Sequence, residues 1–166
     1  MSDDEPSEKG PRDVASRQAH DLFDEDWLWS LADGSPLGSD TGADTWSYFQ
    51  TWRAENPSDS PLDFLDRLLR AWEVPNADWN VLDPAIIGER LKHDHFAILT
   101  RDDAVVAVAF SQLVLDGRVD HEIRTRAFFA LRRQRLPEVS SFRGWVSVPE
   151  RTQRVSHMLH ILESTG

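Results

Sequence analysis

The spacing of apolar residues along the chain predicts helices through most of its length. The first apolar residues recur every four positions, which is the period of one face of an α-helix. These residues are Ala15, Ala19, Phe23, Trp27 and Leu31. We therefore expect a first helix that begins at Asp13 and ends at a C-terminal cap on Gly34.

Capping residues and prolines mark the starts and ends of the later helices. Asp44 is expected to cap a short aromatic helix that stops at Asn56–Pro57. The remaining expected starts are Ser60–Pro61, Asp83–Pro84, Asp120, whose helix stops at Pro137, and the capping box Ser147–Glu150. Each start precedes an apolar face of helical period, and the run after Pro61 is the most regular.

The segment from Phe96 to Leu115 is ambiguous. Its β-branched residues suit a small hairpin within residues 95–110. Its length, together with the polar pair Ser111–Gln112, favours a buried central helix from Ala104 to Leu115. The favoured fold class is all-α, an irregular bundle of about six to seven short helices, and the alternative is α+β with that hairpin. Residues 1–12 are expected to form a disordered acidic tail and residues 13–166 a single helical domain.

Charge is distributed unevenly along the chain. Residues 1–90 hold 20 Asp and Glu against 7 Lys and Arg, whereas residues 91–166 hold 9 against 11. The helical domain thus divides into an acidic half, 13–90, and a neutral to basic half, 91–166. Six of the seven tryptophans also lie in the acidic half. A segment that is both acidic and aromatic suits a basic partner, because charge steers the encounter and buried rings supply binding energy.

This combination is densest around the first helix. Asp24, Glu25 and Asp26 would steer a basic protein surface, and Trp27 and Trp29 would anchor it. The leading hypothesis is therefore a non-enzymatic interaction protein, such as an inhibitor, an immunity protein or a DNA mimic. A place for these tryptophans in the protein's own core is the simpler alternative.

A second binding hypothesis rests on a basic helix. Residues 123–136 contain no acidic residue and five arginines, namely Arg124, Arg126, Arg132, Arg133 and Arg135. Such a helix could contact nucleic-acid phosphate as a subunit of a nucleoprotein complex. It could also pair with the acidic half of the same chain, and the net charge of −11 makes nucleic acid the less favoured partner.

Little in the chain indicates catalysis. Cysteine is absent, and no nucleophile elbow or phosphate-binding glycine loop occurs. Glu89, His93 and His95, or His157 with His160 and Glu163, could offer ligands to a metal-dependent hydrolase. Neither set has the spacing of a recognised metal site, so we assign no catalytic residue, metal or cofactor.

The N-terminal residues are acidic and carry no apolar run of the kind found in secretory signals. No stretch approaches the roughly 20 apolar residues of a membrane span. We expect a cytoplasmic protein without a membrane partner.

Overall fold

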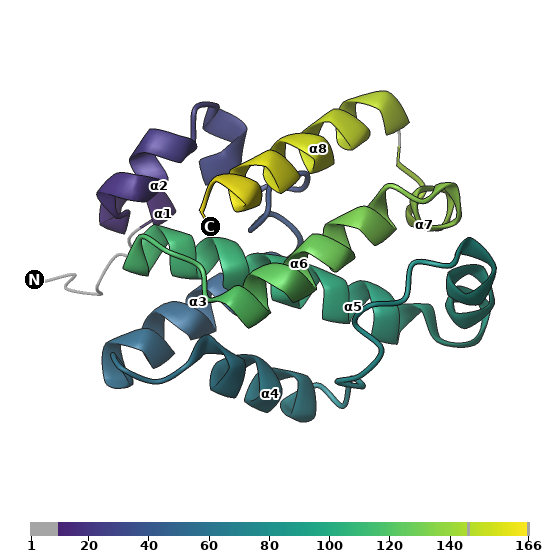
Figure 1. Ribbon diagram of the computed structural model, residues 1–166, viewed down its shortest axis with the longest axis horizontal. Coiled ribbons are helices and arrows are strands. Elements are labelled where there is room, and N and C mark those ends of the chain that lie inside the picture. The colour runs from purple at the N-terminus through teal and green to yellow at the C-terminus, as the bar shows by residue number, and fades with distance from the viewer. Residues whose placement is uncertain (1–9, 146, 166) are drawn as a thin grey trace, which may run out of the picture.

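The computed structural model describes residues 10–145 and 147–165, where all the regular secondary structure is helical and no strand occurs (Figure 1). The α-helices are α1 Pro11–Val14, α2 Arg17–Leu22, α3 Asp40–Glu55, α4 Pro61–Ala71, α5 Pro84–Asp116, α6 His121–Gln134, α7 Pro137–Arg143 and α8 Val148–Ser164, and the 3-10 helix η1 spans Asp26–Trp29. The all-α prediction is confirmed. The alternative hairpin is wrong, because residues 95–110 lie inside α5.

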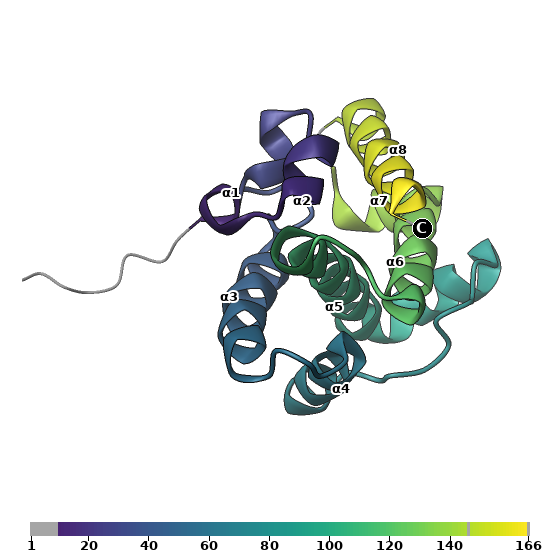
Figure 2. The ribbon, with the colours of Figure 1, turned by 60° about the vertical axis from the view of Figure 1, so that its left-hand side comes forward.

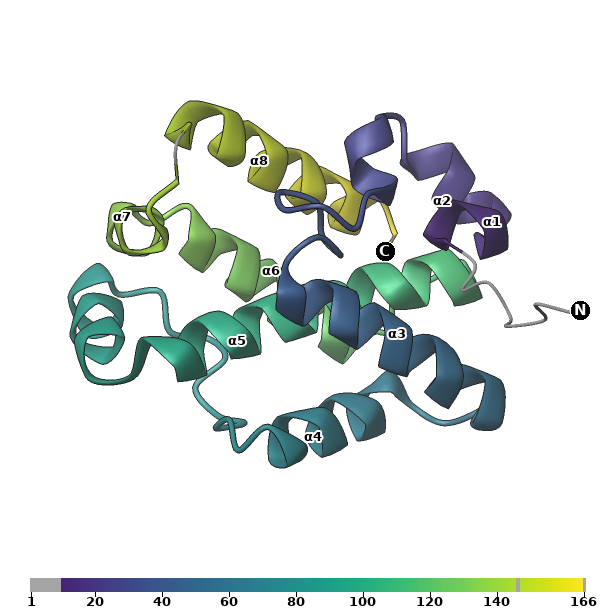
Figure 3. The same ribbon diagram turned by 180° about the vertical axis from the view of Figure 1, so that it is seen from behind.

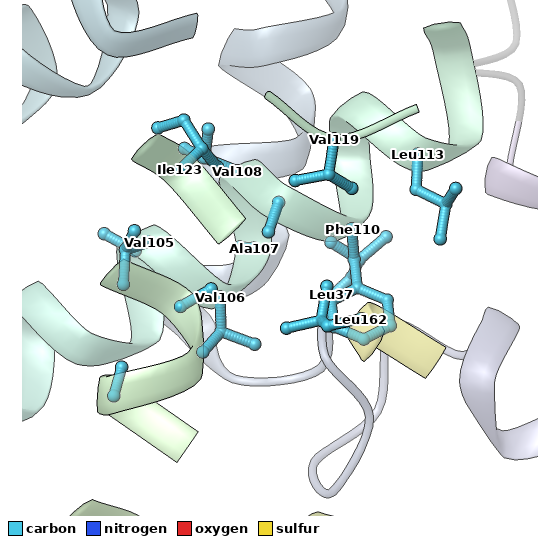
Figure 4. Close-up of a cluster of buried hydrophobic side chains, with 14 of the residues drawn as sticks. Leu37, Val105, Val106, Ala107, Val108, Phe110, Leu113, Val119, Ile123 and Leu162 are labelled. Atoms are coloured by element: carbon cyan, nitrogen blue, oxygen red, sulfur yellow. The ribbon is translucent and has the colours of Figure 1, made fainter. Parts of the chain in front are cut away.

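Helix α5 forms the centre of the bundle. Figure 2 shows it surrounded by α3, α4, α6 and the N-terminal helices. Every residue from Ala104 to Val114 is buried, as expected for a helix that is apolar all round. Its side chains meet Leu37, Ile123 and Leu162 from three other parts of the chain (Figure 4). Length was therefore the better guide to this segment than β-propensity.

A kink divides α5 near its first third. Asp94 has φ −154° and ψ 77°, outside the helical region, and its carboxylate accepts a hydrogen bond from the Ala97 backbone N–H at 3.2 Å. Asp94 thus caps the second part of the helix from within. Residues on both sides of the kink, Ile87, Leu91 and Ile98, form a small separate core with Val139 of α7.

The predicted first helix is wrong, because the chain breaks into α1, α2 and η1. Ser16 has extended backbone angles and accepts a hydrogen bond from the Ala19 N–H, so it caps α2. Its own hydroxyl donates to the Leu113 carbonyl at 2.8 Å, which ties the break to α5. Most of the expected tail, residues 1–9, lies outside the described residues. The described chain starts at Gly10, and α1 begins at Pro11.

Most other helix starts lie where the sequence places them. Ser60 and Asp83 accept hydrogen bonds from the first turns of α4 and α5. Helix α3 begins earlier than predicted, because Ser39, and not Asp44, is its cap. Pro137 does more than stop α6, since it also opens the unpredicted α7 as its first residue.

Within residues 10–145 and 147–165, none of the helices combines the length and apolar character needed to span a membrane.

Candidate functional site

Each carboxylate of the predicted acidic cluster contacts a side chain of the same protein. Asp24 accepts a hydrogen bond from the His157 ring at 2.7 Å, and Asp26 accepts one from Arg12 at 2.9 Å. Glu25 accepts a hydrogen bond from the indole N–H of Trp27. The contact with His157 lowers the pKa of Asp24. Each carboxylate proposed to steer a partner therefore already has a partner in the protein.

The two predicted anchors lie mostly inside the molecule. Trp29 is 8% exposed and packs on Phe23, with ring centroids 4.6 Å apart. Trp27 is partly buried, and its ring lies between the Arg154 guanidinium, at 5.0 Å, and His157. Trp29 thus belongs to the protein's own core, as the simpler alternative predicts, and it cannot anchor a partner without local unfolding. Trp46, Trp52 and Trp79 are buried as well.

An exposed acidic and aromatic surface does exist, but at another place. A groove of about 260 Å³ lies between the start of α3, the end of α4 and α5 just after its kink. We call it the α3–α5 groove, and it is lined by Asp40, Thr41, Asp44, Trp72, Phe96 and Thr100. These helices lie next to one another in Figure 3, where α3 faces the viewer with α4 below it.

Phe96 is the most informative residue of this groove. Its side chain is 59% exposed, the largest exposure among the large hydrophobic residues that the structure describes. It stands two residues after the kink at Asp94, so it belongs to the first turn of the second part of α5. Partly buried Trp72, at the end of α4, lines the same groove.

The negative charges of the groove come from α3. Asp40, Asp44 and Tyr48 follow at four-residue intervals, so they share the outward face of the helix. Tyr48 is 55% exposed. In the described parts of the chain neither Asp40 nor Asp44 forms an ion pair. Unlike Asp24 and Asp26, which pair with His157 and Arg12, they keep their charge available to a partner.

The arginine helix predicted from the sequence is α6, and one of its arginines is structural. Arg133 is fully buried, and it donates to both carboxylate oxygens of Asp102 at 2.8 and 2.9 Å. It also donates to the backbone carbonyls of Trp79 and Val81. Asp102 belongs to the basic half itself, and only the two neutral carbonyls belong to the acidic half, so this pair is not the pairing with acidic-half carboxylates that the intramolecular alternative expects. Arg133 is buried and is therefore not accessible to phosphate.

The other arginines of α6 divide into two groups. Arg126 bonds to Glu122 at 3.3 Å and lies over the Trp79 ring. Arg124, Arg132 and Arg135 have no carboxylate partner in the described structure, and Arg132 lies over Phe128 at 5.0 Å. A small basic and aromatic surface thus remains on this helix.

The histidines do not gather into a metal site. His93 bonds to Glu89 at 3.1 Å, but His95 stacks on Phe142 instead of joining them. His157 bonds to Asp24, while His160 lies exposed one turn further along. Residues 10–145 and 147–165 contain no group of three or more His, Cys, Asp or Glu side chains that could hold a metal ion.

Sequence reasoning missed Phe96 because the favoured central helix began only at Ala104 and the competing hairpin placed Phe96 in a strand. The overlooked signal was Asp94, which occupies an N-cap position three residues before Ala97. Arg101 was missed as well, because it also precedes the predicted start of that helix. No family model, curated protein or solved structure matches this chain. Its function is therefore inferred from its own geometry.

Proposed function

We propose that this chain is a non-enzymatic interaction protein that binds a basic, partly apolar segment of another protein in the α3–α5 groove. The main support for this proposal is that Phe96 is 59% exposed and lines the groove together with two carboxylates that form no ion pair with the described residues. An inhibitor or a DNA-mimic antagonist of a nucleic-acid-binding protein is the concrete form that we favour.

The residues of the groove suit an arginine or lysine side chain. Such a side chain combines an apolar stem with a cationic end. The rings of Phe96 and Trp72 can pack on the stem or face the cation, while Asp40 and Asp44 can accept its hydrogen bonds. A volume of about 260 Å³ is suited to one or two side chains, so the groove would recognise a short motif.

The rest of the molecule supports the same class of partner. A net charge of −11 speeds encounters with a basic surface and disfavours contact with nucleic acid. Exposed Tyr48, one turn after Asp44, extends the aromatic character along α3 beyond the groove. Most of the binding energy would come from the rings of the groove, which become buried when the partner binds, and charge would increase the association rate.

The test is quantitative affinity capture from nuclease-treated lysate of the source cells. The groove variant combines Asp44→Lys with Phe96→Ala. The matched control combines Glu163→Lys with Phe142→Ala, an exposed acid and a 44% exposed phenylalanine outside the groove. We expect one stoichiometric protein to be recovered with the wild type and the control, and to fall at least tenfold with the groove variant.

Equal recovery with both variants would contradict the proposal. Circular dichroism of each variant separates a lost contact from a lost fold. Recovery should also fall with rising salt concentration, because exposed charges are screened within about 10 Å at 0.1 M salt.

A second candidate function rests on α6. Arg124 and Arg132 line a shallow surface with Phe128 and have no carboxylate partner in the described structure. Arginines beside aromatic rings suit single-stranded nucleic acid. Partners that disappear after nuclease treatment, and also with Arg132→Glu, would favour this function over the first. Partners that survive both treatments would exclude it.

A further inference from the structure

A second cavity lies on the neighbouring face of α5, beside its kink. It measures about 330 Å³, and we call it the kink pocket. Its lining residues are Pro75, Ala77, Asp78, Glu89, Arg90, His93, Asp94, Ala97, Ile98 and Arg101. None of these residues lines the α3–α5 groove, so this cavity is independent of the proposed function. Its volume lies at the lower end of the range of small-molecule sites.

A buried arginine forms part of the wall of this pocket. The side chain of Arg101 is 5% exposed. Its Nη1 donates to the Ala77 carbonyl at 2.6 Å, and its Nε donates to Asp102 at 3.3 Å. A guanidinium has five N–H donors. No described residue accepts a hydrogen bond from Nη2, so Arg101 keeps donors that its own protein does not use.

The charge around Arg101 is also incompletely balanced. Two buried guanidiniums, those of Arg101 and Arg133, share the carboxylate of Asp102. Arg133 contacts both carboxylate oxygens at shorter distances than the 3.3 Å between Arg101 and Asp102. Burial lowers the pKa of Arg101, and the neighbouring charge of Arg133 lowers it further. An additional anion at this position would offset both effects.

The remaining walls favour an apolar ligand body. Pro75, Ala77, Ala97 and Ile98 contribute apolar surface. The acidic residues of the rim are already engaged, since Asp78 pairs with Arg90 at 3.3 Å and Glu89 pairs with His93. The Asp94 carboxylate accepts the Ala97 N–H. Arg101 is thus a buried lining charge with donors that the described residues do not use, whereas Arg90, which also lines the pocket, is 39% exposed and open to solvent.

We propose that the kink pocket binds a small organic carboxylate, with the carboxylate on Arg101 and an apolar body against Ala97 and Ile98. The Nη2 donors would form charge-assisted hydrogen bonds to the carboxylate, which are stronger than those between neutral groups. The ligand would bridge the two parts of α5 and the segment 75–78, which all contribute to the pocket.

The experiment is an NMR titration of the full chain with three probes of similar shape: benzoate, neutral benzamide and cationic benzylamine. We expect benzoate to bind at least tenfold more tightly than either analogue, with shifts centred on the amides of Ala77, Ala97 and Arg101. Equal binding of all three probes would overturn the proposal, as would tighter binding of benzylamine or shifts centred elsewhere.

Substituting Arg101 could unfold the protein, so the site is tested with two variants at alanine positions that leave Arg101 in place. Ala97→Leu fills the pocket without touching the guanidinium, and it should weaken benzoate binding at least tenfold. Ala54→Leu places the same change on the exposed face of α3 and should leave binding unchanged. Unchanged binding by Ala97→Leu would refute the proposed site.

Discussion

Replacing Asp102 by asparagine removes the negative charge that holds two buried arginines. The Asp102 side chain is 3% exposed, and it accepts two hydrogen bonds from Arg133 and one from Arg101. Asparagine has nearly the same volume, but it keeps one acceptor oxygen and turns the other into a donor. The variant therefore leaves two guanidiniums buried without a counter-charge and disturbs the packing very little.

The size of the loss can be estimated from the contacts. Hydrogen bonds to charged groups contribute about 1.5–3 kcal/mol each. Oδ1 of Asp102 accepts two of the three bonds and Oδ2 accepts one, so Asp102→Asn removes one or two of them, together with the counter-charge. That range agrees with the roughly 3–5 kcal/mol lost when one member of a buried ion pair is removed. We expect the free energy of unfolding to fall by about 3–5 kcal/mol, a large part of the 5–15 kcal/mol typical of a whole domain.

Urea unfolding followed by circular dichroism measures this change. The control is Asp33→Asn, which disrupts the pair between Asp33 and Arg151 at the surface, where the Asp33 side chain is 75% exposed. Such pairs contribute about 0–1 kcal/mol. A loss below about 1 kcal/mol for Asp102→Asn, with an unchanged slope of unfolding free energy against urea concentration, would refute the idea that this buried ion-pair network stabilises the fold.

Two further predictions concern the polar region where α7 and α8 meet the loop before α3. Gly34 has φ +100°, and a Cβ there would lie 2.6 Å from an Arg154 nitrogen, so Gly34→Ala should lower the free energy of unfolding by about 1–2 kcal/mol. Gly88 lies inside α5, where the nearest atom to an added Cβ is 3.6 Å away, so the control Gly88→Ala should raise it by about 0.5–1 kcal/mol. Thermal or urea unfolding that changed both variants in the same direction would contradict this expectation. Burial raises the pKa of the Asp103 carboxyl despite its pair with Arg143. The native state therefore keeps the carboxyl proton to a higher pH than the unfolded chain does. As the pH rises from about 4 through the raised pKa, ionisation of Asp103 lowers the free energy of unfolding. The asparagine of Asp103→Asn cannot ionise, so the stability of the variant relative to the wild type should increase over that pH window and then level off. Urea titrations in which the relative stability of the variant falls with rising pH would contradict this prediction.

The caps at Ser60 and Asp83 could be read from the sequence, whereas the main break in the N-terminal region could not. The predicted capping box at Ser147 is not formed, because Ser147 lies at the N-cap of α8 without a side-chain hydrogen bond to its first turn. Ser60 and Asp83 act as caps because serine and aspartate side chains accept backbone N–H groups wherever a helix begins. The break at Ser16 depends on its hydrogen bond to Leu113, a residue 97 positions away. A four-residue apolar period in α1, α2 and η1 therefore concealed a change of direction that only tertiary contacts fix.

The candidate site shows the same division between local and tertiary information. The sequence correctly associates acidic residues with aromatic rings, but it cannot show which pairs are exposed. Trp29 is buried by packing on Phe23, and Asp24 is occupied by His157, which lies 133 positions away in the chain. Phe96 and Asp44 come together only because α3 packs beside α5 after its kink.

The central claim is that a basic partner contacts the α3–α5 groove, and zero-length cross-linking tests it most directly. Carbodiimide joins a carboxylate to a lysine amine that it contacts, so mass spectrometry of the linked complex identifies the acidic residues at the interface. We predict links from Asp40 and Asp44 to one basic segment of the captured protein. Links that arise instead from Glu25 and Asp26, with none from α3, would contradict the proposed site and return the interface to η1.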